Sequence, residues 1–247
     1  MFTTTRFHEG VYSIELNNPD KRNALGLKMF DALNRSIHET PLETNVILLQ
    51  GKGKVFCSGF DMKSCAKDIS ILKTYILELS KTIRNLRRLE APVVCIAQGA
   101  AIAGGCALIT GCDFVFGEVD GKYGYPVHQL GISPAVTLPT LRQKVGDGFA
   151  RHLVMSGIII NGNQAFRSGL LSHVQQSAKL AQQFGEQFAT YLSKKPPHAL
   201  RETKKWLNKL DGSLDDELFD AHAIQSASSI DEETQTRLKD IWRENHE

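Results

Sequence analysis

The sequence predicts an α/β domain whose sheet is covered on both faces, followed by a helical region. Short apolar runs alternate along the chain with segments whose apolar residues recur at helical spacing. Most of these runs are continuously apolar, which is typical of strands packed between helices. From about residue 178 onward, strand-forming residues are rare and charged residues are frequent. We therefore expect a core over residues 1–177 and a helical region over residues 178–247.

The first half of the predicted core contains three strands and two helices. The alternating run Val11–Leu16 reads as a strand, which the turn-forming residues Asn17, Asn18 and Pro19 close. Residues 46–49 and Val93–Ile96 are short buried strands. The predicted helices cover residues 29–37 and residues 71–89, and the second helix ends before Pro92.

The second half begins with glycines that lead into a buried helix over residues 106–110. Residues 114–116 form a fourth predicted strand, and residues 149–156 and 164–168 form helices. Asn161 or Asn163 is the expected N-cap of the last of these. Pro196, Pro197 and Gly212 interrupt the region after residue 178, so we expect several helices that pack on the core and on neighbouring subunits.

Composition excludes several classes of protein. The 247 residues are 42% hydrophobic and 23% charged, which suffices for a globular core. The net charge of +2 is too small to indicate binding to nucleic acid. The five cysteines lack C-x-x-C spacing, so we expect reduced thiols and no metal site. No apolar run has the length of a membrane span and no secretory signal is evident, so we expect a cytoplasmic protein with no membrane partner.

Three glycine-containing segments carry the expected chemistry. They are NPDKRNAL (residues 18–25), GKGKVFCSGFDM (residues 51–62) and AQGAAIAGGC (residues 97–106), which runs on to Asp113. Gly59 permits a tight turn that exposes the following amides, and Gly104 begins a helix whose first N–H groups have no internal partner. Two such amides aimed at one oxygen stabilise an oxyanion. Taken singly, each segment is better explained by turns and close packing.

Together, in this order and spacing, the three segments resemble the crotonase (enoyl-CoA hydratase/isomerase) superfamily. Residues 161–171 and 196–200, with Thr203 and Lys204, resemble further segments of that family. The resemblance covers about residues 7–205. It implies a crotonase-like spiral of ββα units, C-terminal helices that form a homotrimer or a dimer of trimers, and an acyl-coenzyme A thioester as substrate. No permanently bound cofactor is implied, since coenzyme A is part of the substrate.

The resemblance also implies roles for the second and third segments. The backbone amides of Phe60 and Gly104 form an oxyanion hole for the thioester carbonyl. Phe60, Asp61 and Met62 lie along the pantetheine of coenzyme A. For Asp61, the residues themselves favour a cap of the next helix over a contact with substrate.

The first segment is expected to lie along the adenine end of coenzyme A. Its expected contact residues are Arg22, Ala24 and Leu25. Lys21 and Arg22 either meet the nucleotide phosphates or form a solvated turn. Near the C-terminal end, Trp242 and Arg243 either stack on adenine and pair with phosphate or pack at a subunit interface.

The sequence departs from the family where acids are expected. Hydratases of the family hold a water between two glutamates that transfer protons. Aligned on Gly104 and Asp113, the place of the first glutamate falls on Ala107, and the place of the second falls on Val127. A further acid position, which some isomerases and a dehalogenase use, falls on Ala135. None of these residues transfers protons, so we expect Ala107, Val127 and Ala135 only to contact substrate.

His128 is the candidate replacement, because a histidine shuttles protons near neutral pH. Neighbouring residues of an extended segment point in opposite directions, so the pattern favours a structural histidine. Ser133 and Cys106 are also near, but no base is evident to activate either.

Two functions remain open. One is an acyl-CoA lyase or isomerase that uses the oxyanion hole with an atypical acid/base or with groups of the substrate. The other is a non-catalytic acyl-CoA-binding or scaffold subunit. The intact oxyanion hole favours the enzyme. A Clp-type serine peptidase is set aside, because residues 99–106 contain no serine.

Overall fold

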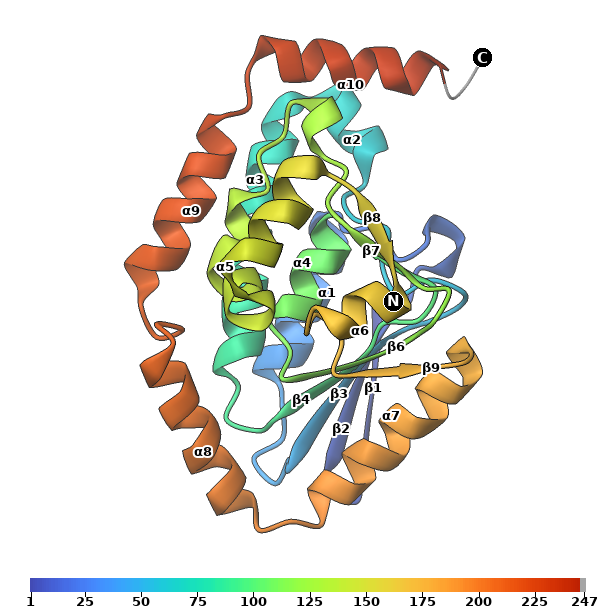
Figure 1. Cartoon of the computed structure of the whole chain (residues 1–247), viewed down its shortest axis with the longest axis vertical. Coiled ribbons are helices and arrows are strands. Elements are labelled where there is room, and N and C mark those ends of the chain that lie inside the picture. Colours follow the sequence, from blue (N-terminus) through green and yellow to red (C-terminus); the bar gives the residue numbers. More distant parts are fainter. Residues whose placement is uncertain (245–247) are drawn as a thin grey trace.

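Two β-sheets of different size organise the chain, as the computed structural model shows (Figure 1). The structure describes residues 1–244, and the side chains of residues 1–240. The larger sheet has the strand order β1-β2-β3-β4-β6-β9 and the smaller has the order β5-β7-β8. The strands are β1 (Thr3–His8), β2 (Val11–Leu16), β3 (Val46–Gly51), β4 (Val93–Ile96), β5 (Ala100–Ile102), β6 (Phe114–Glu118), β7 (Lys122–Gly124), β8 (Ile159–Asn161) and β9 (His173–Gln175).

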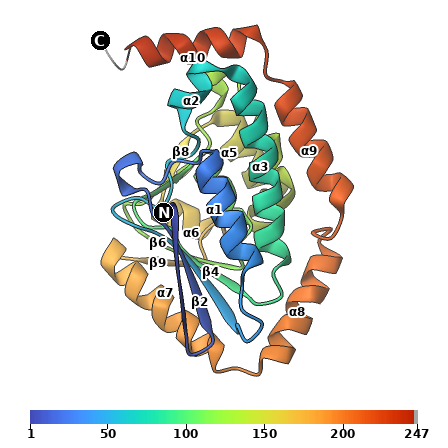
Figure 2. The ribbon, with the colours of Figure 1, turned by 180° about the vertical axis from the view of Figure 1, so that it is seen from behind.

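Helices surround both sheets (Figures 1 and 2). The helices that precede the C-terminal region are α1 (Leu27–His38), α2 (Met62–Lys67), α3 (Ile69–Arg88), α4 (Gly104–Thr110), α5 (Leu138–Ser156) and α6 (Gly162–Arg167). The C-terminal helices are α7 (Ala178–Ser193), α8 (Pro197–Leu210), α9 (Asp216–Ser228) and α10 (Glu232–Glu244). Short 3-10 turns are η1 (Pro19–Lys21), η2 (His128–Leu130) and η3 (Ala135–Thr137).

The larger sheet is covered on both faces, which confirms the prediction from the apolar runs. From β2 to β9 its neighbouring strands are parallel, and β3 shows the alternation between the two faces. Ile47 and Leu49 face the main core, whereas Val46 and Leu48 pack in a second cluster with Leu192 of α7. Figure 1 shows α7 on one face of this sheet, and Figure 2, seen from behind, shows α1 and α3 on the opposite face. Because α7 covers one face, the core extends past the predicted boundary at residue 177.

Some elements differ from the sequence prediction. The polar strand β1 carries no apolar run, and it pairs with β2 across a two-residue turn in which Glu9 and Gly10 both have positive φ. The predicted helix over residues 149–156 is the end of α5, whose backbone is interrupted at Gly146. The N-cap of α6 is Asn161, in a capping box with Gln164.

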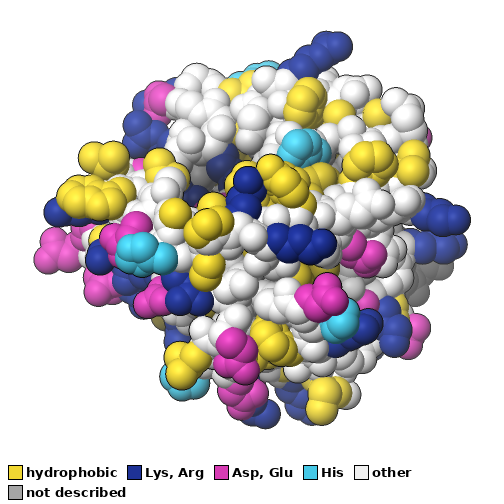
Figure 3. All heavy atoms as spheres, turned by 90° about the horizontal axis from the view of Figure 1, so that it is seen from below, with side chains coloured by type: hydrophobic (Ala, Val, Ile, Leu, Met, Phe, Trp, Pro, Cys, Tyr) yellow, Lys and Arg dark blue, Asp and Glu magenta, His cyan; other side chains and the backbone are white. Residues whose placement is uncertain are grey.

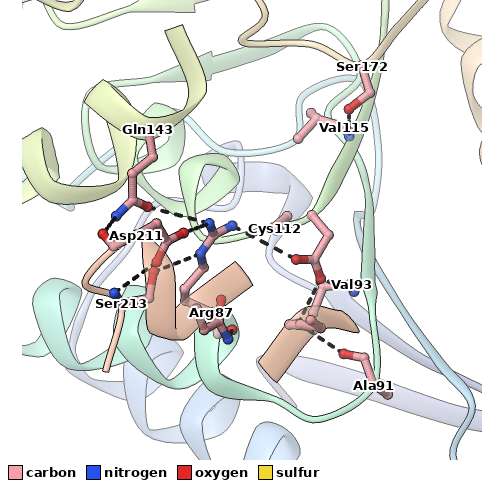
Figure 4. A network of polar contacts seen from close by, with 12 residues as sticks. Arg87, Ala91, Val93, Cys112, Val115, Gln143, Ser172, Asp211 and Ser213 are labelled. Atoms are coloured by element: carbon pink, nitrogen blue, oxygen red, sulfur yellow. Dashed lines mark hydrogen bonds and ion pairs between the residues drawn. The ribbon is translucent and has the colours of Figure 1, made fainter. Parts of the chain in front are cut away.

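A buried ionic network ties α8 to the core (Figure 4). The Lys204 ammonium lies 2.7 Å from a carboxylate oxygen of Asp113 and donates to the Ala91 carbonyl at 3.0 Å. Arg87 of α3 lies 2.5 Å from Asp211 and 3.9 Å from Asp113. Lys204 belongs to the C-terminal segment that resembles the family. In this structure it binds α8 to the core through Asp113 and the Ala91 carbonyl.

The helices α8, α9 and α10 run around the outside of the core (Figure 1). Along the described residues, no helix combines the length and the apolar character needed to cross a bilayer. The side chains of Trp242 and Arg243 lie outside the described residues, so their two predicted roles stay open.

Candidate functional site

A cavity of about 620 Å³ lies between α3, the start of α4, the η2–η3 segment and the C-terminal helices α9 and α10. Its apolar side chains are Phe60, Met62, Ile76, Leu79, Ile102, Ala103, Ala107, Pro126, Val127, Leu130, Ile132, Pro134, Val136 and Leu238. Its polar side chains are Arg22, Ser58, Tyr125, Gln129, Ser133, Thr137 and Ser226. Among the described side chains, no carboxylate and no histidine lines the cavity. It therefore suits a largely apolar ligand.

The amide of Phe60 is held at this cavity by a short parallel bridge. Leu25 donates its N–H to the Gly59 carbonyl at 2.7 Å and accepts from the Asp61 amide at 2.9 Å. Successive amides along an extended segment point to opposite sides, so the Phe60 amide points away from Leu25. Within residues 1–244 the Phe60 amide donates no backbone hydrogen bond. It is therefore available to a ligand.

The second amide belongs to Gly104, the first residue of α4, whose N–H has no partner inside the helix. Ala103 precedes it with a φ of 49° and donates to the Gly124 carbonyl at 2.8 Å. At Gly59, an added Cβ would lie 3.6 Å from the Gly104 nitrogen. At Gly104, an added Cβ would lie 3.2 Å from the Phe60 ring. The two glycines thus bring the Phe60 segment and the start of α4 into close contact beside one cavity.

The structure brings most of the predicted site residues to this cavity. Those that line it are Arg22, Phe60, Met62, Gly104, Ala107 and Val127. Leu25 does not line it but is fully buried, and its side chain would lie 3.1 Å from a Cβ at Gly104. Ala24 and Ala135 are half-buried and lie outside the lining.

Asp61 is at the N-cap position of α2, but its side chain accepts no hydrogen bond from the helix. Instead it accepts from the Lys21 ammonium at 3.3 Å. Asp61 is therefore the N-cap residue, as expected, but its side chain pairs with Lys21 and not with the helix. Lys21 is paired with Asp61. The neighbouring cation Arg22 has no described acid within 4.0 Å, so its guanidinium is available to a ligand.

His128 does not line the cavity, and its side chain is exposed. Here the chain is not extended but forms a tight turn, in which the Leu130 amide donates to the Val127 carbonyl at 3.0 Å. The turn leaves Val127 at the cavity and His128 beside Gly157, where an added Cβ would lie 3.9 Å from its ring. The geometry therefore gives His128 no contact with a ligand in the cavity and does not support the predicted acid/base role.

Tyr125 and Thr137 form a buried hydroxyl pair at the cavity wall. Their oxygens are 3.0 Å apart, and burial raises the pKa of Tyr125, which therefore stays a neutral hydroxyl. Neither residue was among the site residues predicted from the sequence. The same holds for Ser226 and Leu238, which reach the cavity from α9 and α10. No local pattern relates these helices to the core, since Ser226 donates to the Ser133 carbonyl across 93 residues.

Comparison with known proteins decides the family. Residues 6–236 match the family model described as Enoyl-CoA hydratase/isomerase. The chain belongs to this family. Over 215 residues it is 30% identical to the putative enoyl-CoA hydratase/isomerase YngF of Bacillus subtilis, covering 85% of this chain and 81% of that protein. It is also 30% identical over 197 residues to Enoyl-CoA hydratase domain-containing protein 3, mitochondrial, of Rattus norvegicus, covering 78% of this chain and 64% of the relative.

Solved structures confirm the predicted crotonase fold. An enoyl-CoA hydratase/isomerase from Xanthobacter autotrophicus Py2 superposes with a TM-score of 0.86 at 20% identity, covering 100% of this chain and 98% of that chain. An enoyl-CoA hydratase from Bacillus halodurans gives 0.86 at 22% identity, covering 97% and 99%. Pseudomonas aeruginosa AtuE gives 0.81 at 26% identity, covering 93% and 91%. The fold of this enoyl-CoA hydratase/isomerase family member therefore extends through the C-terminal helices.

The cysteines of this crotonase-fold chain are buried, which has a chemical consequence. Burial raises the pKa of Cys57, Cys65 and Cys106 to about 12, so these thiols stay protonated and weakly nucleophilic at neutral pH. Cys106 therefore does not serve as an activated nucleophile beside Gly104.

We expect iodoacetamide at pH 8 to leave all five cysteines unlabelled in the folded protein, because each side chain is buried and out of reach of the reagent. Intact-mass spectrometry checks this, and the same reaction in guanidinium chloride should add five labels. Rapid labelling of one native cysteine would contradict the burial of that residue.

Proposed function

We propose that this chain binds an acyl-CoA thioester and acts on it as a lyase or isomerase of the enoyl-CoA hydratase type, with an atypical acid/base. The observation that carries the proposal is that the Phe60 amide and the Gly104 amide flank one largely apolar cavity and donate no hydrogen bond to the residues that the structure describes. In this proposal the two amides hold the thioester oxygen and stabilise the enolate or oxyanion that forms there. Preorganised donors of this kind are typically the largest electrostatic contribution to such reactions.

The remaining predicted residues contact the coenzyme A part of the substrate. Arg22 lines the cavity and has no acidic partner among the described side chains, so we assign it to a phosphate of the nucleotide. Ala24 and Leu25 are assigned to the adenine end. Asp61 and Met62 are assigned to the pantetheine. No resident cofactor or metal is required, because coenzyme A arrives as part of the substrate.

Proton transfer is the unusual part of the proposal. Ala107 and Val127 line the cavity at the places where we align the two family glutamates, and Ala135, at the third acid position, lies just outside it. The described lining side chains offer hydroxyl groups, Tyr125 and Thr137 among them, but no group that titrates near neutral pH. We therefore assign proton transfer to water, to the substrate or to these hydroxyls. The same absence of acids favours the second candidate function, a non-catalytic acyl-CoA-binding or scaffold subunit.

A thermal-shift screen with coenzyme A and a panel of acyl-CoAs tests the proposal, with mass spectrometry of the same mixtures for turnover. We expect acyl-CoAs to raise the Tm and one thioester to be converted. Stabilisation without any conversion would favour the binding subunit. Absence of stabilisation by every thioester would contradict both candidates.

The same panel should include matched acyl groups with and without a terminal carboxylate. The one cation among the described lining residues is Arg22, which the proposal uses for the nucleotide, so a carboxylate on the acyl group would be buried without a partner. We expect the uncharged member of each pair to bind at least about tenfold more tightly. If calorimetry gives the same Kd for both members of a pair, the cavity does not discriminate against a charged acyl group. That result would leave acyl-CoA binding itself uncontradicted.

A homotrimer or dimer of trimers and a cytoplasmic location stay predictions. The large apolar side chains Trp206, Leu207 and Leu210 are exposed on α8, which supports association through this helix.

A further inference from the structure

A second hollow, of about 410 Å³, lies at the end of the molecule where β3 and β4 begin. Thr44 and Ala91, which precede these two parallel strands, form part of its wall. The ends of α1 and α3 and the side of α8 form the rest. It shares no lining residue with the 620 Å³ cavity beside Phe60 and Gly104. Figure 3 looks onto this end of the molecule, where Lys and Arg side chains lie in and beside a hollow.

Three buried polar atoms belong to side chains of this hollow and have no hydrogen-bond partner among the described residues. They are Thr44 Oγ1, Arg88 Nη2 and Arg201 Nε. The only other such atoms in the described chain belong to Gln98 and Glu118, neither of which lines this hollow. Buried polar groups without partners are rare and costly. Three of them around one hollow indicate a polar ligand.

The charges around the hollow indicate the sign of that ligand. Arg201 donates to the backbone carbonyls of Thr44 at 2.9 Å and Leu42 at 3.4 Å, and no described acid lies within 4.0 Å of it. Arg88 lies 2.7 Å from Asp216, so its charge is compensated, but its Nη2 is not used. Glu90 is the one acid among the lining residues, and it is exposed. The hollow therefore favours a negative ligand.

We propose that this hollow binds a small oxyanion, a carboxylate or phosphate group, between Arg88 and Arg201, with the Thr44 hydroxyl as a third donor. Guanidinium groups match the geometry of both oxyanions, and their charge shortens and strengthens the hydrogen bonds. Thr44 is only 2% exposed, and the three unused atoms are covered in this conformation. Binding is therefore accompanied by a rotation of the Arg201 guanidinium toward the anion.

The hollow is larger than the anion alone requires. Ile37, Ile47 and Leu89 supply apolar wall beside the charged residues. Free inorganic phosphate and an acidic metabolite with a small apolar part share the chemistry that the site recognises. Titration with phosphate, acetate and a short alkyl phosphate distinguishes these two kinds of ligand. Only the alkyl phosphate contacts the apolar wall, so tighter binding of that compound indicates a metabolite with an apolar part.

Calorimetric titration at constant ionic strength tests the site, in the presence of saturating coenzyme A so that any site for that ligand is already filled. We expect saturable binding of at least one of the three anions. Arg201→Gln should raise the Kd at least tenfold. The control is Arg167→Gln, because the Arg167 side chain is exposed and does not line the hollow, and this change should leave the Kd unchanged. No saturable binding of any of the three, or the same Kd in Arg201→Gln, would overturn the proposal.

Thr44→Val separates anion binding from a purely structural role. The Thr44 hydroxyl has no partner in the described chain, so its removal should leave the Tm without anion unchanged or higher. The same change should raise the Kd of the anion several-fold, because one donor is lost. A lower Tm with an unchanged Kd would mean that Thr44 only supports the fold, and would contradict its place in the site.

Discussion

Replacing Lys204 with Met is expected to lower the free energy of unfolding by about 3–5 kcal/mol. The lysine is 5% exposed, and its ammonium group lies 2.7 Å from Asp113. Without it, the Asp113 carboxylate stays mostly buried, with Arg87 at 3.9 Å as its nearest described cation. An uncompensated buried charge costs more than the ion pair contributes. Urea denaturation at neutral pH measures the change.

Two further variants locate the origin of this loss. In Lys204→Met with Asp113→Asn the uncompensated charge is gone, so part of the stability should return although two contacts are missing. Lys205→Met is the matched control, because that neighbouring side chain is 71% exposed and should change stability by less than about 0.5 kcal/mol. A cost below about 1 kcal/mol for Lys204→Met would show that the network of Figure 4 does not hold α8 to the core.

Replacing Gly104 with Pro is expected to reduce turnover of the best thioester by about 100- to 1,000-fold, or about 3 kcal/mol of barrier. Proline removes the N–H that we assign to the oxyanion hole, and the first position of a helix is where proline fits best. Ala103, which precedes this position, has a positive φ, and the Tm of the variant shows whether the backbone there accommodates the proline ring. An unchanged kcat in a folded variant would contradict the assigned role of this amide.

Gly104→Ala keeps the amide and adds only a methyl group, so it serves as the control. That methyl would lie 3.2 Å from the Phe60 ring and 3.1 Å from Leu25, so a smaller loss is expected. Binding supplies a readout even without catalysis. A thioester should bind more tightly than the thioether analogue that lacks its carbonyl oxygen, and Gly104→Pro should abolish that difference.

Continuous apolar runs and glycine-containing segments were the features that the sequence made predictable. Residues 46–49 and Val93–Ile96 are apolar throughout, and they form central parallel strands because only such runs suit a sheet covered on both faces. The glycines at 59 and 104 marked the place where two segments meet beside the cavity, since close backbone approach excludes a side chain there.

The features that the sequence did not predict depend on contacts between distant parts of the chain or on local turns. Strand β1 is polar and is defined by its pairing with β2 rather than by apolar residues. The turn at η2 directs His128 outward, whereas alternation in an extended strand was the assumed geometry. Leu238 reaches the cavity from α10, and no local pattern encodes where that helix docks.

The cover that α7 gives to the larger sheet also bears on how the protein is made. Val46, Leu48, Val94 and Ile96 are synthesised long before Ala189 and Leu192, the buried α7 residues of the same cluster. Until α7 leaves the ribosome, the nascent chain therefore carries an apolar sheet face with nothing of its own to cover it. Such surfaces are where nascent chains aggregate or recruit chaperones, so co-translational vulnerability in this protein should centre on the interval before α7 emerges.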